Sequence, residues 1–471
     1  MKKLLFAALA ALTITSCTDD ISSFNDQDKA PTAVPAGALF ANATMAYYDF
    51  TSVQNVNLNN LRLWSQHWTQ TTYVDESNFQ LNDRDVNGRT FSTMYITVIR
   101  DCEEARAALD DLLGATDAEI AASEAAIEVM EVFAYSLLVD LFGDVPYTQA
   151  FNDSTNTPAY DDDAAIYADL LSRLSDAAAD LTGMNTFGSS DLIYGGDAAA
   201  WQKAAYSLML RMAVRMISVD PTVAQQYGEQ AIAGGVFGSA TDDMRLMYSS
   251  TPPHTHPMWE TLVQSGRSDY IASATLGRVM NDLSDPRRGA FFRNLDSTGA
   301  VTGAPHGRQS AYGDYSQPGN ALEDPTWSHA AISYVETEFL MAHAAVAGWT
   351  GAGAAATHYE NAIRASITEW GGTSMQADDY MMEADVAWSA ADAAMLIGKQ
   401  KWIAMYSNAP EAYSAVRQYN IPMDTANLAQ TVTPLRYSYP LDEYSLNEDN
   451  VRAAGDKFNE DDTFSPVFWD M

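Results

Sequence analysis

Apolar residues recur at intervals of three and four along most of the chain, which is the spacing of helices with one buried face. The sharpest start signal is the capping box Thr116-Asp-Ala-Glu119, in which the threonine hydroxyl and the glutamate carboxylate each accept a hydrogen bond from the other residue's amide. We expect this helix to end at Phe142, because Gly143 favours a left-handed stop and Pro146 cannot continue a helix.

Three more helices are expected after this one. The first begins in the acidic run 161–163, which suits the positive end of a helix, and stops near Gly183. The second is capped by Asp197 and has to end before Pro221. The third begins with that proline at the tolerated first position and ends at Gly234-Gly235. The short connections among these segments imply antiparallel neighbours.

A weak internal repeat supports this picture. Ala224 and Tyr227 lead to an alanine-isoleucine pair, and Ala356 and Tyr359 lead to another far downstream. Small residues beside an aromatic anchor suit stacked helical hairpins of the tetratricopeptide kind, although alanine-rich helices can produce such a match by coincidence. The pattern is therefore compatible with a repeat of helical hairpins and with coincidence, and it does not decide between them.

Two regions lack the helical pattern, about 241–323 and about 422–471. They hold many of the prolines and turn glycines, together with many tyrosines and phenylalanines. Long irregular segments in a compact protein are usually functional or disordered, and a high aromatic content argues against disorder. We therefore expect ordered loops in both regions.

The first sixteen residues have the organisation of a secretory signal: two lysines, a short apolar run and small residues before Cys17. A cysteine at that place resembles the lipobox of bacterial lipoproteins, and the Asp19-Asp20 pair resembles the surface-export signal of Bacteroidetes lipoproteins. Residues 1–16 are thus expected to be a signal peptide. Cys17 is expected to be acylated and to hold the protein on a membrane, with residues 17–38 as the anchor and tether and 39–471 as the body.

The composition of the chain argues against several other kinds of function. The formal net charge is −36, so the phosphates of a nucleic acid would be repelled. The chain has two cysteines, and if Cys17 is acylated then Cys102 is left alone, which excludes an intramolecular disulfide.

Arg211 and Arg215 stand one turn apart on an apolar helix, where we expect them to pair with buried carboxylates such as Glu128 or Glu336.

Several blocks, in order along the chain, resemble the SusD/RagB family of outer-membrane nutrient-binding lipoproteins. Each block is modest alone, but together they cover almost the whole chain after the signal peptide. His343 stands where that family usually has glutamate. The matching blocks are 126–147 with its Phe-Gly-Asp-Val-Pro turn, 201–216, the Asp-Pro-Arg turn at 284–287, 332–349, 400–404 and 436–443.

This resemblance implies an all-α, tetratricopeptide-like scaffold of stacked helical hairpins with a loop-rich, ligand-facing side. It implies a non-enzymatic cell-surface protein, facing the exterior of the outer membrane, that captures an oligosaccharide. It also implies a partner, a SusC-like TonB-dependent outer-membrane transporter that receives the cargo. Two alternatives stay open: a surface glycan hydrolase, and a lid of the same transporter type whose cargo is a peptide.

Sugars present C–H faces to flat rings and hydroxyl groups to carboxylates, amides and arginine. The family resemblance puts part of the glycan-facing surface between the first helices, and the loop-rich insertion at 241–323 adds further aromatic residues. The resulting ligand-binding candidates are Trp64, Trp68, Tyr73, Asp75, Asn78, Phe79, Trp259, Arg267, Tyr312, Tyr315 and Trp327.

The sequence shows no motif that predicts catalysis, so no catalytic residue is assigned. One pattern resembles a metal site: Asp83, Asp85 and Asn87 copy the first positions of an EF-hand loop, but Met94 replaces the bidentate glutamate at position 12. A polar surface turn is the preferred interpretation. We therefore expect no cofactor, with calcium at this turn as the weaker alternative.

Overall fold

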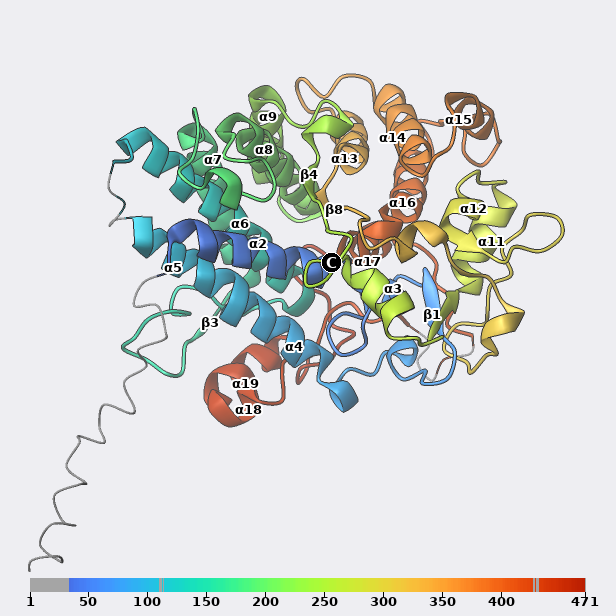
Figure 1. Cartoon of the computed structure of the whole chain (residues 1–471), viewed down its shortest axis with the longest axis horizontal. Coiled ribbons are helices and arrows are strands. Elements are labelled where there is room, and N and C mark those ends of the chain that lie inside the picture. The colour runs from blue at the N-terminus through green and yellow to red at the C-terminus, as the bar shows by residue number, and fades with distance from the viewer. Residues whose placement is uncertain (1–33, 110–111, 113, 427, 429–431, 471) are drawn as a thin grey trace, which may run out of the picture. The chain divides into compact units, whose positions relative to one another are not determined.

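Antiparallel helices dominate the part of the chain that the computed structural model describes, residues 34–109, 112, 114–426, 428 and 432–470 (Figure 1). The predicted signal peptide and Cys17 lie outside these residues. The longer helices are α2 (Ala36–Ser52), α5 (Arg100–Leu109), α6 (Asp117–Phe142), α7 (Asp163–Asp180), α8 (Ala198–Arg215), α9 (Pro221–Gly234), α11 (Ala274–Asp282), α13 (Tyr334–Val346), α14 (Ala355–Glu369), α15 (Ser374–Met381), α16 (Ala393–Ala404), α17 (Ala409–Gln418) and α19 (Glu448–Lys457).

The four helices with clear start and stop signals are confirmed. Both halves of the Thr116–Glu119 capping box form, and Gly143 ends α6 at a φ of 81°. The side chains of Asp162, Asp197 and Asp220 each accept backbone N–H groups at the first turns of α7, α8 and α9. Capping chemistry therefore fixes these helices locally, before tertiary packing is considered.

The expected stacked hairpins form a continuous series. Helices α6 and α7, α8 and α9, α13 and α14, and α16 and α17 pack as neighbouring pairs, and α8 contacts α13 to join the first half of the series to the second. Figure 1 shows α7, α8, α9, α13 and α14 in succession along its upper edge. The series is the all-α scaffold that the family resemblance implies.

Some predicted boundaries are wrong. Residues 36–38, placed in the tether, already belong to α2. The irregular region 241–323 contains α11, a strongly amphipathic helix that Ser273 caps, and the region 422–471 contains α18 (Glu443–Leu446) and α19. These helices are short, and the surrounding prolines and glycines hide their period in the sequence.

In the described part of the chain, four small antiparallel strand pairs connect segments that lie between the longer helices. They connect β1 (Trp68–Gln70) to β5 (Tyr270–Ala272), β2 (Val145–Pro146) to β3 (Tyr160–Asp161), β4 (Met244–Leu246) to β8 (His329–Ile332), and β6 (Phe292–Arg293) to β7 (Gln317–Pro318). Shorter helices complete the fold at α3 (Leu61–Trp64), α4 (Val86–Ser92), α10 (Pro257–Trp259) and α12 (Arg288–Phe291), with a π-helical turn over Thr93–Ile99 between α4 and α5.

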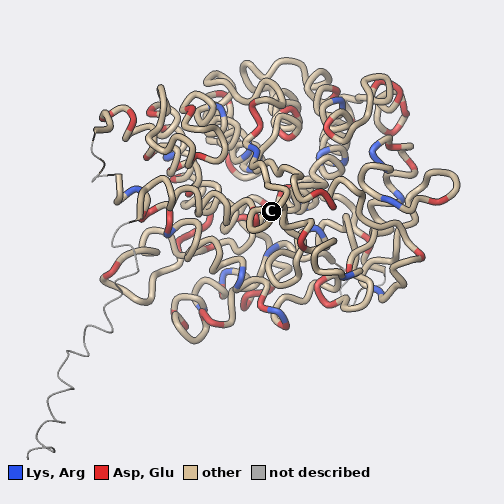
Figure 2. Tube along the Cα trace, viewed as in Figure 1, with Lys and Arg blue, Asp and Glu red and all other residues tan. Residues whose placement is uncertain are grey.

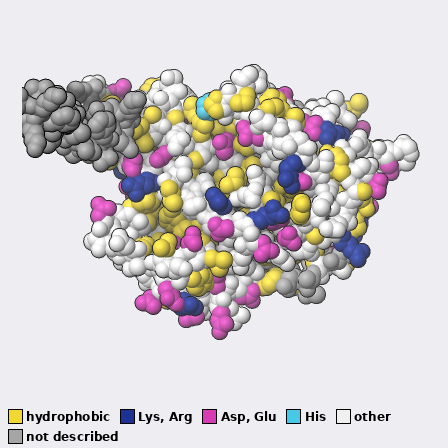
Figure 3. Space-filling model, turned by 60° about the horizontal axis from the view of Figure 1, so that its bottom comes forward, with side chains coloured by type: hydrophobic (Ala, Val, Ile, Leu, Met, Phe, Trp, Pro, Cys, Tyr) yellow, Lys and Arg dark blue, Asp and Glu magenta, His cyan; other side chains and the backbone are white. Residues whose placement is uncertain are grey.

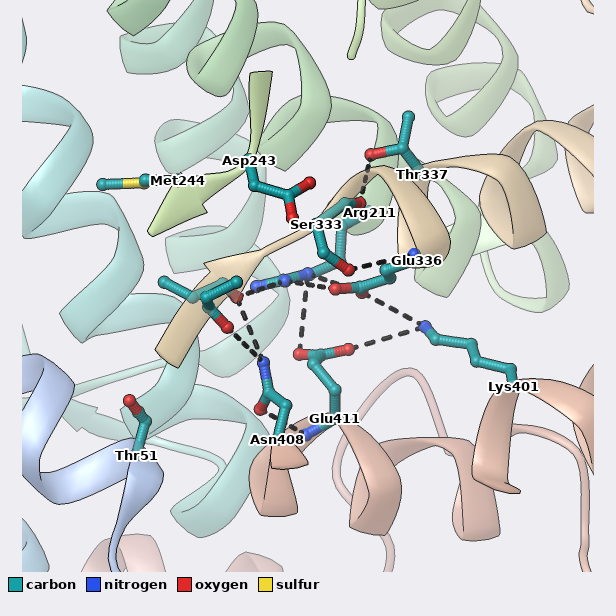
Figure 4. A network of polar contacts seen from close by, with 12 residues as sticks. Thr51, Arg211, Asp243, Met244, Ser333, Glu336, Thr337, Lys401, Asn408 and Glu411 are labelled. Atoms are coloured by element: carbon teal, nitrogen blue, oxygen red, sulfur yellow. Dashed lines mark hydrogen bonds and ion pairs between the residues drawn. The ribbon is translucent and has the colours of Figure 1, made fainter. Parts of the chain in front are cut away.

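A buried ionic network joins α8, α13, α16 and α17 (Figure 4). Arg211 donates from Nε and Nη2 to the two carboxylate oxygens of Glu336 at 2.9 and 2.6 Å, a pairing that the sequence predicts. Lys401 Nζ lies 3.3 Å from Glu336 and 3.5 Å from Glu411. Burial alone would raise the pKa of Glu411, but Arg211, Arg215 and Lys401 together hold it well below its usual range.

Arg215 extends the network to α6. Its two terminal nitrogens donate to Asp140 at 2.5 Å and to Glu411 at 2.6 Å. Three cations therefore face three carboxylates, so the buried charges balance. Glu128, the other partner that we expected for these arginines, instead pairs with Arg106 and Arg173.

The segment after residue 435 packs against α6 and α7 and supplies polar partners to both helices. Arg436 donates to the carbonyl of Phe142 at 3.0 Å, and the indole N–H of Trp469 donates to Asp140 at 2.8 Å. Lys457 lies among Asp144, Asp162 and Asp163, with Nζ at 2.5, 3.0 and 2.7 Å from their carboxylates. Residues distant in sequence thus complete the polar environment of α6 and α7.

Acidic residues occur on every part of the described trace, with fewer basic residues between them (Figure 2). Among the described residues, no helix combines the length and the apolar character that crossing a membrane requires. Cys102 is buried and free, as predicted, and burial raises the pKa of its thiol well above the usual range.

Replacing Glu411 with alanine tests the ionic network. The change leaves two arginines and a lysine buried with too few carboxylates, so we expect the free energy of unfolding to fall by about 3–5 kcal/mol. Chemical denaturation of the purified protein measures this loss. The matched control is Glu448→Ala, which breaks an exposed pair with Arg452 and should cost less than about 1 kcal/mol. Equal losses in both variants would contradict the interpretation.

Candidate functional site

An open groove lies where the end of α2 meets the loops around β1 and β5. Its main part is a cavity of about 490 Å³, and the side chains of Arg84, Arg267 and Asp269 also line a narrower hollow beside it. We call both together the binding groove. Its other polar and aromatic lining residues are Asp49, Asn55, Asn57, Gln70, Thr72, Tyr73, Thr93, Glu260, Thr261, Ser265 and Tyr270.

Backbone hydrogen bonds hold the two walls of the groove together. Thr71 N–H donates to the carbonyl of Asp269 at 2.9 Å, and its hydroxyl donates to the carbonyl of Ser268 at 2.8 Å. These bonds continue the β1–β5 ladder into the loops. Gly266 lets the chain turn back at this point, because its φ of 65° is in the left-handed region. The groove therefore has a fixed frame although loops form much of its lining.

Arg84 is oriented from behind by a buried carboxylate. Its Nε lies 2.6 Å from Glu76, whose other oxygen accepts from Gln70 at 2.6 Å. Burial raises the pKa of Glu76, and hydrogen bonding from Gln70 partly offsets that effect. The Arg84 guanidinium also lies 5.8 Å from the centre of the Tyr73 ring.

Tyr73 and Arg267 are the predicted residues that the structure brings together. Tyr73 is 58% exposed, and the Arg267 side chain is 56% exposed while it pairs with Asp269. Both therefore present hydrogen-bonding groups and apolar surface to solvent. Figure 3 shows that Lys and Arg side chains also gather near the middle of one face, beside apolar side chains, on a chain with a net charge of −36.

Two carboxylates line the opposite wall. Asp49 accepts from the hydroxyl of Tyr248 at 2.9 Å, and Glu260 accepts from the hydroxyl of Thr255 at 2.8 Å. Asn55 and Asn57, on the turn after α2, add amide groups, and the two side chains contact each other at 3.1 Å. The groove thus offers acceptors and donors on all sides, with one exposed ring.

Three of the predicted ligand residues are core residues instead. Trp64 and Trp68 are fully buried, and their indole N–H groups donate to the carbonyl of Glu76 and to the hydroxyl of Tyr406. Phe79 packs edge-on against Trp64 at 5.9 Å. None of these rings can stack on a ligand in this structure. Their helical spacing reflects packing, which is the commonest use of buried aromatic residues.

The remaining predicted residues lie outside the groove lining. Asn78 is used locally, since its amide nitrogen donates to the carbonyls of Val74 and Gly307, both at 2.8 Å. Trp327 packs against Trp370 at 5.1 Å. The hydroxyl of Tyr312 accepts from Arg293 at 3.2 Å. Partly exposed positions without a place in the lining are Asp75, Trp259 and Tyr315.

Sequence reasoning missed Arg84, Asp269 and the two asparagines on the turn. Arg84 lies between Asp83 and Asp85, inside the EF-hand-like pattern, and that pattern assigns a role to the acidic residues but none to the arginine. In that turn Asn87 points inward, and its amide nitrogen donates to the carbonyls of Ser438 and Tyr439 at 3.0 and 3.1 Å. The polar turn stays our preferred interpretation of Asp83, Asp85 and Asn87, and calcium stays the untested alternative.

One group of three carboxylates in the described part of the chain is close enough to hold a metal ion, at Asp144, Asp162 and Asp163. Lys457 already places its ammonium group among them. The group therefore already binds a cation of the chain itself, and it serves the cap of α7, where Asp144 accepts from the Asp163 amide at 2.9 Å.

Several solved structures have the same fold. A chitin-binding protein is 24% identical, with a TM-score of 0.80 over 93% of this chain and 100% of its own. A chitin-binding SusD homologue from Flavobacterium johnsoniae is 21% identical, with a TM-score of 0.78 over 93% and 98%. A SusD-like protein from Bacteroides thetaiotaomicron is 22% identical, with a TM-score of 0.78 over 92% and 98%. These likenesses establish the fold.

No curated protein matches the chain. Residues 28–440 match the SusD-like family described as starch-binding and associating with the outer membrane. The match spans most of the chain, including every element that builds the binding groove and most of the helical series. The chain therefore belongs to the SusD-like family of outer-membrane-associated proteins.

Proposed function

We propose that this protein binds an oligosaccharide in the binding groove, as the nutrient-capturing member of an outer-membrane uptake system. The observation that carries the proposal is the groove itself, in which the exposed Tyr73 ring lies beside Arg84, Arg267 and Asp269. Membership of a family described as starch-binding gives the groove its expected class of ligand.

The chemistry of the lining supports a sugar. A ring with 58% of its surface exposed offers a flat apolar face to the C–H groups of a pyranose. Asparagine amides, arginines and carboxylates around it can accept from and donate to hydroxyl groups. A cavity of about 490 Å³ is open enough for a short oligosaccharide and falls in the usual range of small-molecule sites.

The names of the similar structures suggest which sugars to test first. Two of them are described as chitin-binding, and the family as starch-binding. Oligomers of N-acetylglucosamine and of glucose are therefore the first ligands of choice. A peptide cargo is the alternative within the same transporter system, and a peptide panel beside the glycan panel separates the two.

We further propose that Cys17 carries the lipid that holds the protein on the outer face of the outer membrane, and that a SusC-like TonB-dependent transporter receives the cargo. The signal-like residues 1–16 and the lipobox-like sequence before Cys17 support the anchor. The family's description as associating with the outer membrane supports the location. Co-purification of the barrel from native membranes tests the partnership.

A surface hydrolase remains the competing function, and Asp49 is the group in the groove that favours it. Burial raises the pKa of Asp49 to about 6, although the hydrogen bond from Tyr248 opposes the shift. A glycosidase needs a protonated acid of this kind together with a second carboxylate at a set separation. We assign the protein to binding without turnover, and a search for shortened products after long incubation with each bound glycan decides between them.

Removal of the exposed ring tests the groove. We expect Tyr73→Ala to weaken binding of the best glycan at least about tenfold, because the stacking surface is lost. Isothermal titration calorimetry on the form lacking residues 1–17 measures the change. Tyr444→Ala is the matched control, since Tyr444 also lies beneath an arginine, at 5.5 Å, but outside the groove. Unchanged affinity in Tyr73→Ala would place the ligand elsewhere.

Loss of the thiol tests the anchor. We expect Cys17→Ala to abolish incorporation of labelled palmitate and to release the protein from the membrane fraction, because no other acylation site is proposed. Metabolic labelling followed by membrane fractionation measures both effects. A Cys102→Ala variant, which removes the other cysteine, is the control and should stay labelled and membrane-bound.

The raised pKa of Asp49 predicts a pH-dependent stability difference. The carboxyl group titrates near pH 6 in the folded protein and near 3.8 otherwise, so the folded state gains protons and stability at low pH and loses that advantage as pH rises through 6. Asp49→Asn removes the charge and keeps an acceptor for Tyr248. We expect its stability relative to the parent protein to rise by up to about 3 kcal/mol between pH 4 and pH 7.5. Urea denaturation at both pH values measures this, and a pH-independent difference would contradict it.

A further inference from the structure

A second cavity of about 490 Å³ lies in the helical part of the protein, and it shares no lining residue with the binding groove. It opens between α5, α6, α7 and the loop after β2. Its floor is made of buried side chains, Glu131 and Tyr135, and its rim is exposed. The other lining residues are Glu103, Tyr147, Thr148, Phe151, Asn152, Asp169 and Arg173.

Carboxylates outnumber the basic groups around this cavity. Arg106 pairs with Glu103 at 2.8 Å, with Glu128 at 3.1 Å and with Glu131 at 2.8 Å. Arg173 pairs with Glu128 and, at 2.7 Å, with Glu131. Asp169 adds a further carboxylate at the rim, where it accepts from the hydroxyl of Tyr147 at 2.5 Å. Two arginines therefore face four carboxylates.

One carboxylate oxygen of Glu131 lacks a hydrogen-bond donor among the residues that the structure describes. Its Oε2 accepts from both arginines, but its Oε1 is buried and finds no hydrogen-bond partner among the residues that the structure describes. Its side chain is only 1% exposed. Burial raises the pKa of this carboxyl to about 7, although the arginines oppose the shift. A buried acceptor without a donor is costly, so Oε1 marks where a donor from a ligand would be favourable.

Aromatic rings form the rest of the wall. The rings of Tyr135 and Tyr147 meet edge to face at 4.8 Å, and Phe151 is 38% exposed at the rim. Arg173 already lies over the Tyr147 ring at 5.7 Å, which shows that this wall accommodates a cation. Carboxylates combined with aromatic rings are the usual surroundings of a bound ammonium group.

We propose that this cavity is a second binding site, for a small polar molecule that carries a protonated primary amine. The ammonium group donates to Glu131 Oε1 and balances part of the surplus negative charge, while Thr148, Asn152 and Asp169 bind the polar remainder of the molecule. An anionic ligand is excluded by the four carboxylates. A neutral sugar would leave the charge surplus unchanged, so the site distinguishes an amine from its acetylated counterpart.

Two kinds of molecule supply such an amine: an amino sugar and the lysine side chain of a peptide. Calorimetry with glucosamine and with Nα-acetyl-lysine amide represents these sources, and N-acetylglucosamine and the doubly acetylated lysine amide are the neutral counterparts. The buffer is phosphate, because Tris is itself an amine. We expect at least one amine to bind at least ten times more tightly than its neutral counterpart. If neither amine binds, or if acetylation makes no difference, the proposal is wrong.

Variants locate the site. We expect Glu131→Gln to weaken amine binding at least tenfold, and Asp169→Asn, an exposed change that leaves the core intact, to weaken it measurably even if Glu131→Gln does not fold. The matched control is Glu104→Gln on the same helix as Glu103, where the carboxylate pairs with Arg100 at 2.9 Å outside the cavity. Tyr73→Ala should bind the amine normally, which separates this site from the binding groove. Normal amine binding by Asp169→Asn and by folded Glu131→Gln would overturn the proposal.

Discussion

The buried charge balance between α6, α8, α13, α16 and α17 is the constraint on which the rest of the structure depends. Burying Arg211, Arg215 and Lys401 would be prohibitive unless each met a carboxylate, and three carboxylates from three other parts of the chain supply that match. A shift of a single turn between the hairpins would leave buried charges unpaired, so the network disfavours other registers. Apolar packing stabilises the series, and the ionic network specifies it.

The binding groove depends on this rigid series indirectly. Its walls are the end of α2 and several loops, and buried groups attach those loops to the scaffold. The indole of Trp68 on β1 donates to the hydroxyl of Tyr406 in the turn after α16, and Arg84 is held by the buried Glu76. The exposed side chains, such as Tyr73, are then free to meet a ligand. Loop residues of the same type therefore have two different roles: some are buried and hold a loop in place, and others are exposed and can contact a ligand.

That division explains how much the sequence could predict. Helices with a cap, an apolar period and a glycine stop were predictable because each signal acts within a few residues, as at Thr116–Glu119 and Gly143. Pairing of Arg211 with Glu336 was predictable from the cost of an unpaired buried charge. The candidate site was not predictable. Trp64 and Tyr73 are aromatic residues nine positions apart, and only the tertiary structure buries one and exposes the other. Glu131 carried a usable signal, because it and Glu128 are acids within an otherwise apolar stretch of α6.

The contacts that residues 436–469 make with α6 and α7 have a consequence for the order in which the protein acquires its structure. Asp140 and Phe142 obtain partners from Trp469 and Arg436, and the start of α7 obtains one from Lys457. Helices α6 and α7 therefore lack these polar partners while the ribosome is still making the later residues. The native packing of this early part of the chain can form completely only after residues 436–469 have been made, so we expect the helical series to fold late and cooperatively.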